Sequence, residues 1–369
     1  MDNKKKRDFA HQRHDGMTLV ELLVVLAIIA VLLAIAAPLV RNSSRDRRVR
    51  EASRALSGYI NGARTLAAQR GRPVGIWIER FQTEQANRGM YSTTVFTAEV
   101  PPPYAGFDTA SKARLEVLPN EVYPRIIFDD LFLTGSEAII KPGDAFSIRF
   151  DYRGPIYPGL RRLSDGVYEL GVSGNLSDLP EYARANPQGV HFQIFRSPVK
   201  SLQEPLQLPA NTAIDLSVSG WQANGQQLHP PLVYVTGQMP LDPLKPGGPV
   251  VILFNPSGDV DRIYARDGNN DGVVENDFVN ASVHLLVGRA RQVVGPSPET
   301  ATFPGNLYLD NAVDVSNIMD MSALWVSISH RTGLVTTTEN ARILKDSDGK
   351  WDIGSAREFA LHKVGMGGR

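Results

Sequence analysis

The chain of 369 residues contains no cysteine, so it forms no disulfide and holds no thiolate metal site, cysteine nucleophile or lipidated cysteine. Neither charge sign is in excess, because 39 Lys+Arg face 39 Asp+Glu; this argues against a globally basic nucleic-acid binder. The seven histidines have no metal-ligand spacing, and the sequence carries neither a phosphate-binding loop nor a dinucleotide-binding glycine motif. We therefore expect no catalytic residues and no nucleic-acid partner.

One long apolar segment is present near the start of the chain. Residues 22–40 carry no charged side chain and would span about 28 Å as a helix, close to the thickness of a hydrocarbon core. The preceding residues 1–16 are polar and contain five basic side chains, which is typical of a targeting segment. A cleaved secretory signal peptide and an ordinary single-pass anchor are two interpretations. Neither explains Glu21, since a carboxylate at the edge of an apolar helix costs about 2–3 kcal/mol.

A third interpretation comes from residues 16–26, Gly-Met-Thr-Leu-Val-Glu-Leu-Leu-Val-Val-Leu. They resemble the class III signal of type IV prepilins and type II secretion pseudopilins. The resemblance implies that a prepilin peptidase cuts between Gly16 and Met17 and methylates the new amine. The family most often has phenylalanine where this chain has Met17. Pro38 stands where pilin stalk helices commonly carry a kinking proline.

The resemblance also implies an assembly role for Glu21. In apolar surroundings an unpaired charge is expensive, so the Glu21 carboxylate and the amine of Met17 each need a partner. A neighbouring subunit's amine would satisfy Glu21 and set the axial register of a filament. A pair within one chain is the alternative, because positions i and i+4 lie on one helix face. The resemblance favours the intermolecular pair.

The expected fold is α+β and pilin-like: a long N-terminal helix packed on a head of antiparallel β-sheet. Its parts are a leader (1–16), a transmembrane and assembly half of the stalk helix (17–42), an amphipathic half (43–71) and a β-rich head (72–369). Apolar residues three and four positions apart mark the amphipathic half, from Val49 to Ala67. Pro73 is expected to stop this helix.

Short strands should dominate the head, because the 32 glycines and 25 prolines predict many turns. The expected strands are 74–78, 92–100, 146–152, 168–172, 191–195, 213–218, 232–235, 250–254, 283–287, 324–329 and 334–338, followed by a short amphipathic helix at 355–364. Strands without regular intervening helices favour antiparallel pairing.

Three short segments of the head are similar to the minor pseudopilin H and fimbrial T group: residues 63–74, 252–258 and 324–335. Residues from about 81 to 249 would then be an insertion. The resemblance implies a minor pilin-like subunit of a type II secretion or type IV pilus-like periplasmic filament. Its partners would be a prepilin peptidase, other pilin or pseudopilin subunits and inner-membrane lipid, with the leader cytoplasmic and the head periplasmic. The alternative is a membrane-tethered binding module whose β-rich insertion captures a ligand.

One loop suggests a calcium site. The segment Asp-Gly-Asn-Asn-Asp-Gly at 267–272 matches the start of a calcium-binding loop, in which oxygen ligands alternate around a glycine turn. The candidate ligands are Asp267, Asn269, Asp271, the carbonyl of Val273, Glu275 and Asp277. The match fails at its twelfth position, where Phe278 replaces a bidentate glutamate. A polar hairpin tip is the alternative.

Overall fold

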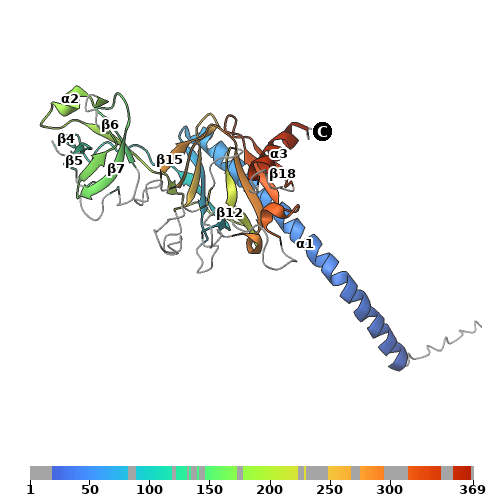
Figure 1. Ribbon diagram of the computed structural model, residues 1–369. Helices are drawn as coiled ribbons and strands as arrows, with labels where there is room; N and C mark the ends of the chain where they lie inside the picture. The colour runs from blue at the N-terminus through green and yellow to red at the C-terminus, as the bar shows by residue number, and fades with distance from the viewer. Residues whose placement is uncertain are drawn as a thin grey trace, which may run out of the picture. The chain divides into compact units, whose positions relative to one another are not determined.

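The computed structural model describes residues 19–81, 89–118, 122–130, 133, 139–140, 146–172, 178–222, 228–229, 248–266, 275–294, 315–341 and 352–366 (Figure 1). The chain divides into two compact units, Met1–Arg47 and Arg48–Arg369. In the first unit, the described residues belong to the N-terminal part of helix α1. The second unit holds the rest of α1 and every described strand.

Helix α1 spans Leu19–Arg70 and runs through Pro38. Within the second unit its apolar stripe is buried, as the sequence predicts. The buried members are Val49, Ala52, Leu56, Ile60, Ala63 and Ala67. The helix ends before Gly71, whose φ of 61° is a left-handed conformation that glycine adopts at helix C-termini. The end is fixed to the head, because Arg70 and Arg72 both form ion pairs with Glu99.

The first sheet has the strand order β10-β3-β1-β13-β14-β15, and β11 also pairs with β3. Its strands are β1 (Val74–Glu79), β3 (Thr94–Glu99), β10 (Val199–Lys200), β11 (Leu206–Gln207), β13 (Val250–Phe254), β14 (Val260–Arg266) and β15 (Glu275–Phe278). The second sheet has the order β18-β17-β16-β12-β2. Its strands are β2 (Tyr91–Ser92), β12 (Thr212–Trp221), β16 (Val283–Arg289), β17 (Leu324–Ile328) and β18 (Val335–Glu339).

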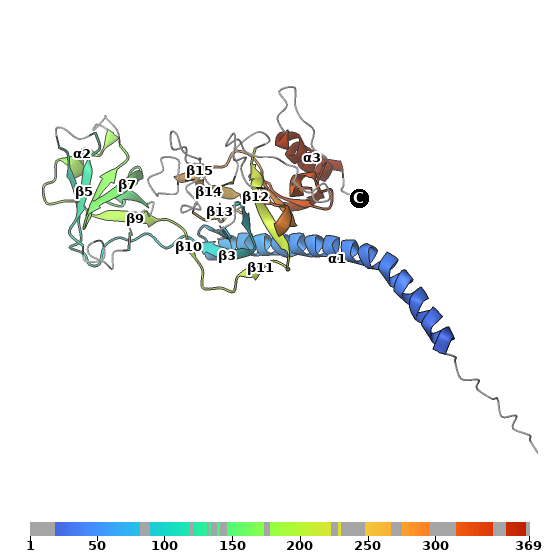
Figure 2. The ribbon, with the colours of Figure 1, turned by 60° about the horizontal axis from the view of Figure 1, so that its bottom comes forward.

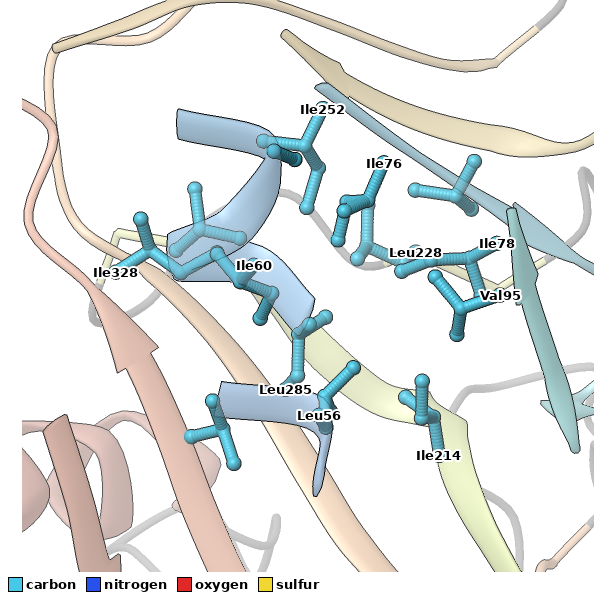
Figure 3. Packing of buried hydrophobic residues seen from close by; sticks show 14 of the residues in the cluster. Leu56, Ile60, Ile76, Ile78, Val95, Ile214, Leu228, Ile252, Leu285 and Ile328 are labelled. Atoms are coloured by element: carbon cyan, nitrogen blue, oxygen red, sulfur yellow. The ribbon is translucent and has the colours of Figure 1, made fainter. Parts of the chain in front are cut away.

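One hydrophobic core joins α1 to both of these sheets. Leu56 and Ile60 of the helix, Ile76 and Ile252 of the first sheet, and Leu285 of the second are each fully buried in it (Figure 3). Alternate residues of a strand point to opposite faces, so Ile76 and its neighbour two positions on share the helix-facing side. Figure 2 shows α1 running alongside strands of both sheets, such as β3 and β12. This burial explains why the amphipathic half of the stalk is helical in the head.

The third sheet has the order β4-β5-β8-β7-β6-β9. Its strands are β4 (Ala113–Glu116), β5 (Arg125–Phe128), β6 (Phe146–Phe150), β7 (Tyr157–Ser164), β8 (Val167–Leu170) and β9 (Phe192–Arg196). Ala113 of β4, at one edge, pairs with Val190 just before β9, at the other edge, so the sheet closes on itself. Aromatic and aliphatic side chains fill its interior, among them Phe128, Tyr168 and Phe192.

The predicted insertion, 81–249, contributes to all three sheets. It supplies β3 to the first sheet, β12 to the second, and every strand of the third. Strands β4 to β9 pair with no described strand outside that stretch. That residues 81–249 are an insertion stays a prediction. Within this stretch, the third sheet is self-contained, because its strands pair only with one another.

The remaining elements are α2 (Glu181–Arg184), η3 (Ala290–Gln292), η4 (Asn317–Met319) and α3 (Ile353–Met366). Helix α3 confirms the helix predicted at 355–364 and packs Ala356 and Ala360 against Trp325 of the second sheet. Since every pairing among the described strands is antiparallel, the predicted α+β class is confirmed. The strand predicted at 232–235 lies outside the described residues.

Candidate functional site

The N-terminal part of α1 exposes apolar side chains around its whole circumference. Its large hydrophobic residues from Leu19 to Leu33 are between 43% and 78% exposed. A helix that is apolar on every side is normally buried in protein or lipid, and an exposed apolar surface of this kind marks an interaction site. We therefore expect lipid or another protein to cover this segment.

Glu21 lies in the first turn of α1, among these exposed apolar residues. A negative charge there is favourable, because the first turn of a helix carries a partial positive charge. Gly16 and Met17 lie outside the described residues, so cleavage between them and the pairing of Glu21 with an amine stay predictions. Pro38 is placed in the helix, and its assembly role likewise stays a prediction.

Nowhere in the part of the chain that the structure describes is a helix both long enough and apolar enough to cross a membrane. That residues 17–42 cross a membrane stays a prediction.

The predicted calcium loop is described only at its end. Asp267, Asn269, Asp271 and Val273 lie outside the described residues. Glu275 and Asp277 belong to strand β15, where they pair with Arg266 and Ile263 of β14. Glu275 and Asp277 therefore lie in a paired strand, whereas the calcium prediction placed them in a loop. Among described residues, no group of three or more histidine, cysteine, aspartate or glutamate side chains could hold a metal ion.

Sequence reasoning missed a buried carboxylate in the second sheet. Asp215 accepts hydrogen bonds from the backbone N–H and the hydroxyl of Ser217, and from the amide of Asn317 at 2.9 Å. Burial raises the pKa of Asp215 to about 6, although these hydrogen bonds oppose the shift. The register of β12 against β16 shifts between Asp215 and Gly220, so the carboxylate stands at an irregularity of the strand. The signal in the sequence was an aspartate and serines inside a strand that is otherwise apolar.

A buried histidine lies in the same sheet. His284 of β16 is directly opposite Ser327 of β17, and its Nδ1 is 2.8 Å from the serine hydroxyl. Burial, and then the positive charge of Arg357, lowers the pKa of His284 to about 3. Because His284 and Ser327 are both buried, a substrate would not reach them. We assign this pair to the architecture of the sheet.

Two buried arginines fix backbone segments in the head. Arg80 follows β1 and donates hydrogen bonds to the carbonyls of Gly89, Leu228 and Gly248. Arg357 of α3 donates to the carbonyls of Val218 and Gln222 at the irregular end of β12. Burial lowers the pKa of each guanidinium to about 9. Nothing in the local sequence distinguishes these residues from surface arginines.

Comparison with known proteins gives one result, at the N-terminus. Residues 11–37 match the family described as the prokaryotic N-terminal methylation motif. The match includes Gly16, Met17 and Glu21, the residues that carried the resemblance in the sequence. No curated protein and no solved structure matches the chain significantly. The matched motif is the substrate signal of prepilin peptidases. The chain thus carries the class III signal of a type IV pilin-like precursor.

Proposed function

We propose that this protein is a minor pilin-like, or pseudopilin, structural subunit of a type II secretion or type IV pilus-like periplasmic filament. The observation that carries the proposal is the exposed apolar segment of α1, with Glu21 in its first turn and the methylation motif over the same residues. Before assembly this segment would lie in the inner membrane, with the leader in the cytoplasm and the head in the periplasm. In a filament, neighbouring stalk helices would cover it.

Contacts in the head support the finer assignment to the minor pseudopilin H and fimbrial T group. The three segments that resemble this group meet at one place in the second unit. Arg64 of α1 donates a hydrogen bond to the carbonyl of Gly258 at 3.2 Å. Gly333 of the last hairpin packs against both, because a Cβ added there would lie 1.9 Å from the Gly258 carbonyl oxygen and 3.1 Å from the Arg64 side chain. The end of the stalk, the turn after β13 and the last hairpin thus form one connected unit. A shared packing arrangement would explain why these three segments resemble the same group.

Processing is the first test. We expect the mature chain to begin at Met17 with a methylated amine, and Gly16→Asp to leave the leader attached. Intact-mass measurement of the full chain from cells with and without a prepilin peptidase checks this. Asp15→Asn is the matched control, because it changes the same segment without touching the bond to be cut. A wild-type chain that begins at Met1 or Ala37 would refute the proposal.

Assembly is the second test. Glu21→Ala should be processed and inserted, since losing a charge from an apolar helix eases insertion, but it should not join other subunits. Crosslinking in membranes measures the joining. Glu51→Ala is the control, because Glu51 is an exposed carboxylate on the same helix within the second unit. Hetero-crosslinks at the wild-type level in Glu21→Ala would contradict the assembly role.

A membrane-tethered binding module is the second candidate function. The observation that favours it is the closed third sheet, which has its own core and pairs with no described strand of the other sheets. A tethered binder would reach the membrane and bind its ligand in cells that lack the peptidase. A filament subunit would not assemble there, so crosslinking in membranes of cells without the peptidase separates these two functions.

A further inference from the structure

A four-residue turn follows β6 in the third sheet and has an unusual backbone. Asp151 and Tyr152 have φ values of 51° and 56°, and the N–H of Arg153 donates to the carbonyl of Phe150 at 3.2 Å. Turns with two consecutive positive φ values normally use asparagine, aspartate or glycine, and a bulky residue in this region is an outlier. Tyrosine therefore occupies a position where glycine or asparagine would be less strained.

Two contacts from other elements hold this turn in place. The N–H of Asp151 donates to the carbonyl of His191 at 2.7 Å, next to the start of β9. The hydroxyl of Tyr182, from α2, donates to the carbonyl of Phe150 at 3.2 Å. Strained backbone persists where the surrounding structure imposes it, and such positions are concentrated at binding sites.

The turn carries a half-exposed aromatic ring and an ion pair between the two residues that flank it in the sequence. The Tyr152 side chain is half exposed, and its ring stacks on that of His191 with centroids 6.2 Å apart. The guanidinium of Arg153 lies 4.8 Å from the ring centroid of Tyr182 and 2.9 Å from a carboxylate oxygen of Asp151. The Tyr152 ring is thus packed on one side by His191, and its two sequence neighbours carry a hydrogen-bond donor and an acceptor.

We propose that this turn binds a neutral oligosaccharide, with Tyr152 as the stacking platform. The C–H groups on one face of a sugar ring pack against an aromatic face, while its hydroxyls accept from guanidinium N–H groups and donate to a carboxylate. Asp151 and Arg153 supply these two groups. Their charges cancel, so the turn lacks the positive excess that binding of a nucleic acid or another polyanion would require.

The experiment is calorimetric titration of the full-length chain, kept in solution by a detergent without a sugar headgroup. The probes are cellohexaose, chitohexaose and maltohexaose, with a deoxythymidine oligonucleotide as the anionic comparison. We expect at least one hexaose to bind the wild type. Tyr152→Asn should weaken that binding by about tenfold or more, whereas Tyr152→Phe, which retains the ring, should bind like the wild type. Tyr123→Asn is the control, because Tyr123 is another exposed tyrosine of the same part of the chain, without a positive φ.

Thermal unfolding of the same variants separates binding from packing. Asparagine tolerates the left-handed conformation, so Tyr152→Asn should raise the Tm by about 2 °C while it removes the ring. Failure of the wild type to bind any of the three hexaoses, or equal binding by Tyr152→Asn, would overturn the proposal. So would tighter binding of the oligonucleotide than of every hexaose. Loss of binding accompanied by a fall in Tm would assign Tyr152 to packing and would also overturn it.

Discussion

Two buried groups of the second sheet should change the protein's stability with pH in opposite directions. The pKa of Asp215 rises from 3.8 to about 6 on folding. Its contribution to stability is therefore fully present below pH 3.8 and is lost as the pH rises through 6. The pKa of His284 falls from 6.5 to about 3. Its contribution is present above pH 6.5 and is lost as the pH falls through 3.

The two magnitudes follow from the shifts. One pKa unit corresponds to about 1.4 kcal/mol, so Asp215 contributes about 3 kcal/mol and His284 about 5 kcal/mol over their full ranges. Between about pH 4 and 6 each group changes the free energy of unfolding by about 1.4 kcal/mol per pH unit, with opposite signs. In the wild type these two slopes nearly cancel. Removing either group should therefore leave a free energy of unfolding that changes with pH according to the other group alone.

Urea unfolding of the full-length chain at a series of pH values measures these slopes, with tryptophan fluorescence as the signal. Trp325 lies beside His284, with ring centroids 6.2 Å apart, and is fully buried. As the pH falls from 6 to 4, Asp215→Asn should lose stability relative to the wild type, and His284→Asn should gain it. Leu286→Val is the control, because it changes packing on β16 without removing a titrating group, so its difference from the wild type should not depend on pH. A pH-independent difference for Asp215→Asn, or slopes of the same sign for both variants, would refute this reasoning.

Three further predictions concern packing and calcium. Gly58→Ala should stabilise the chain by about 1 kcal/mol in urea unfolding, because a glycine inside a helix is costly and a Cβ there meets nothing within 4 Å; a loss of stability would contradict this. Gly333→Ala should destabilise the chain by at least about 1–2 kcal/mol, because Gly333 has a φ of 60° and a Cβ there would lie 1.9 Å from the carbonyl oxygen of Gly258. An unchanged midpoint of urea unfolding would contradict this close approach. If the loop at 267–277 binds calcium, millimolar calcium should raise the Tm of the wild type but not of Asp271→Ala, whereas equal Tm values with calcium and with chelator would leave the loop as a turn.

Local periodicity was enough to predict most regular elements of this fold. The stripe from Val49 to Ala67 repeats every three to four residues, and the helix buries that stripe. Alternation in 146–150 and 325–329 supported the strands predicted at 146–152 and 324–329, and β6 and β17 end two residues and one residue earlier. Strands β4, β5, β7, β14 and β15 and the two-residue strands β10 and β11 were not predicted. In β7, Pro158 and Gly159 are residues typical of turns, although they lie inside the strand.

Sequence periodicity did not reveal which strands share a sheet. Ala113 and Val190, the pair that closes the third sheet, are far apart in the sequence, and neither has a side chain that specifies a partner. Strands β3 and β12 lie in the predicted insertion but belong to the two sheets around α1. Pairing of this kind depends on which faces can be buried together, and that is a property of the whole chain.

The candidate sites divide in the same way. The methylation motif is contiguous in the sequence, so the sequence by itself determined that the chain carries it. The turn at Tyr152 was decided only by the tertiary structure. Its left-handed backbone and its contacts with His191 and Tyr182 come from elements that are separate in the sequence. The same holds for Asp215 and His284, because a pKa shifts when folding removes water from the charged group, and burial is settled only when all the surrounding strands have packed.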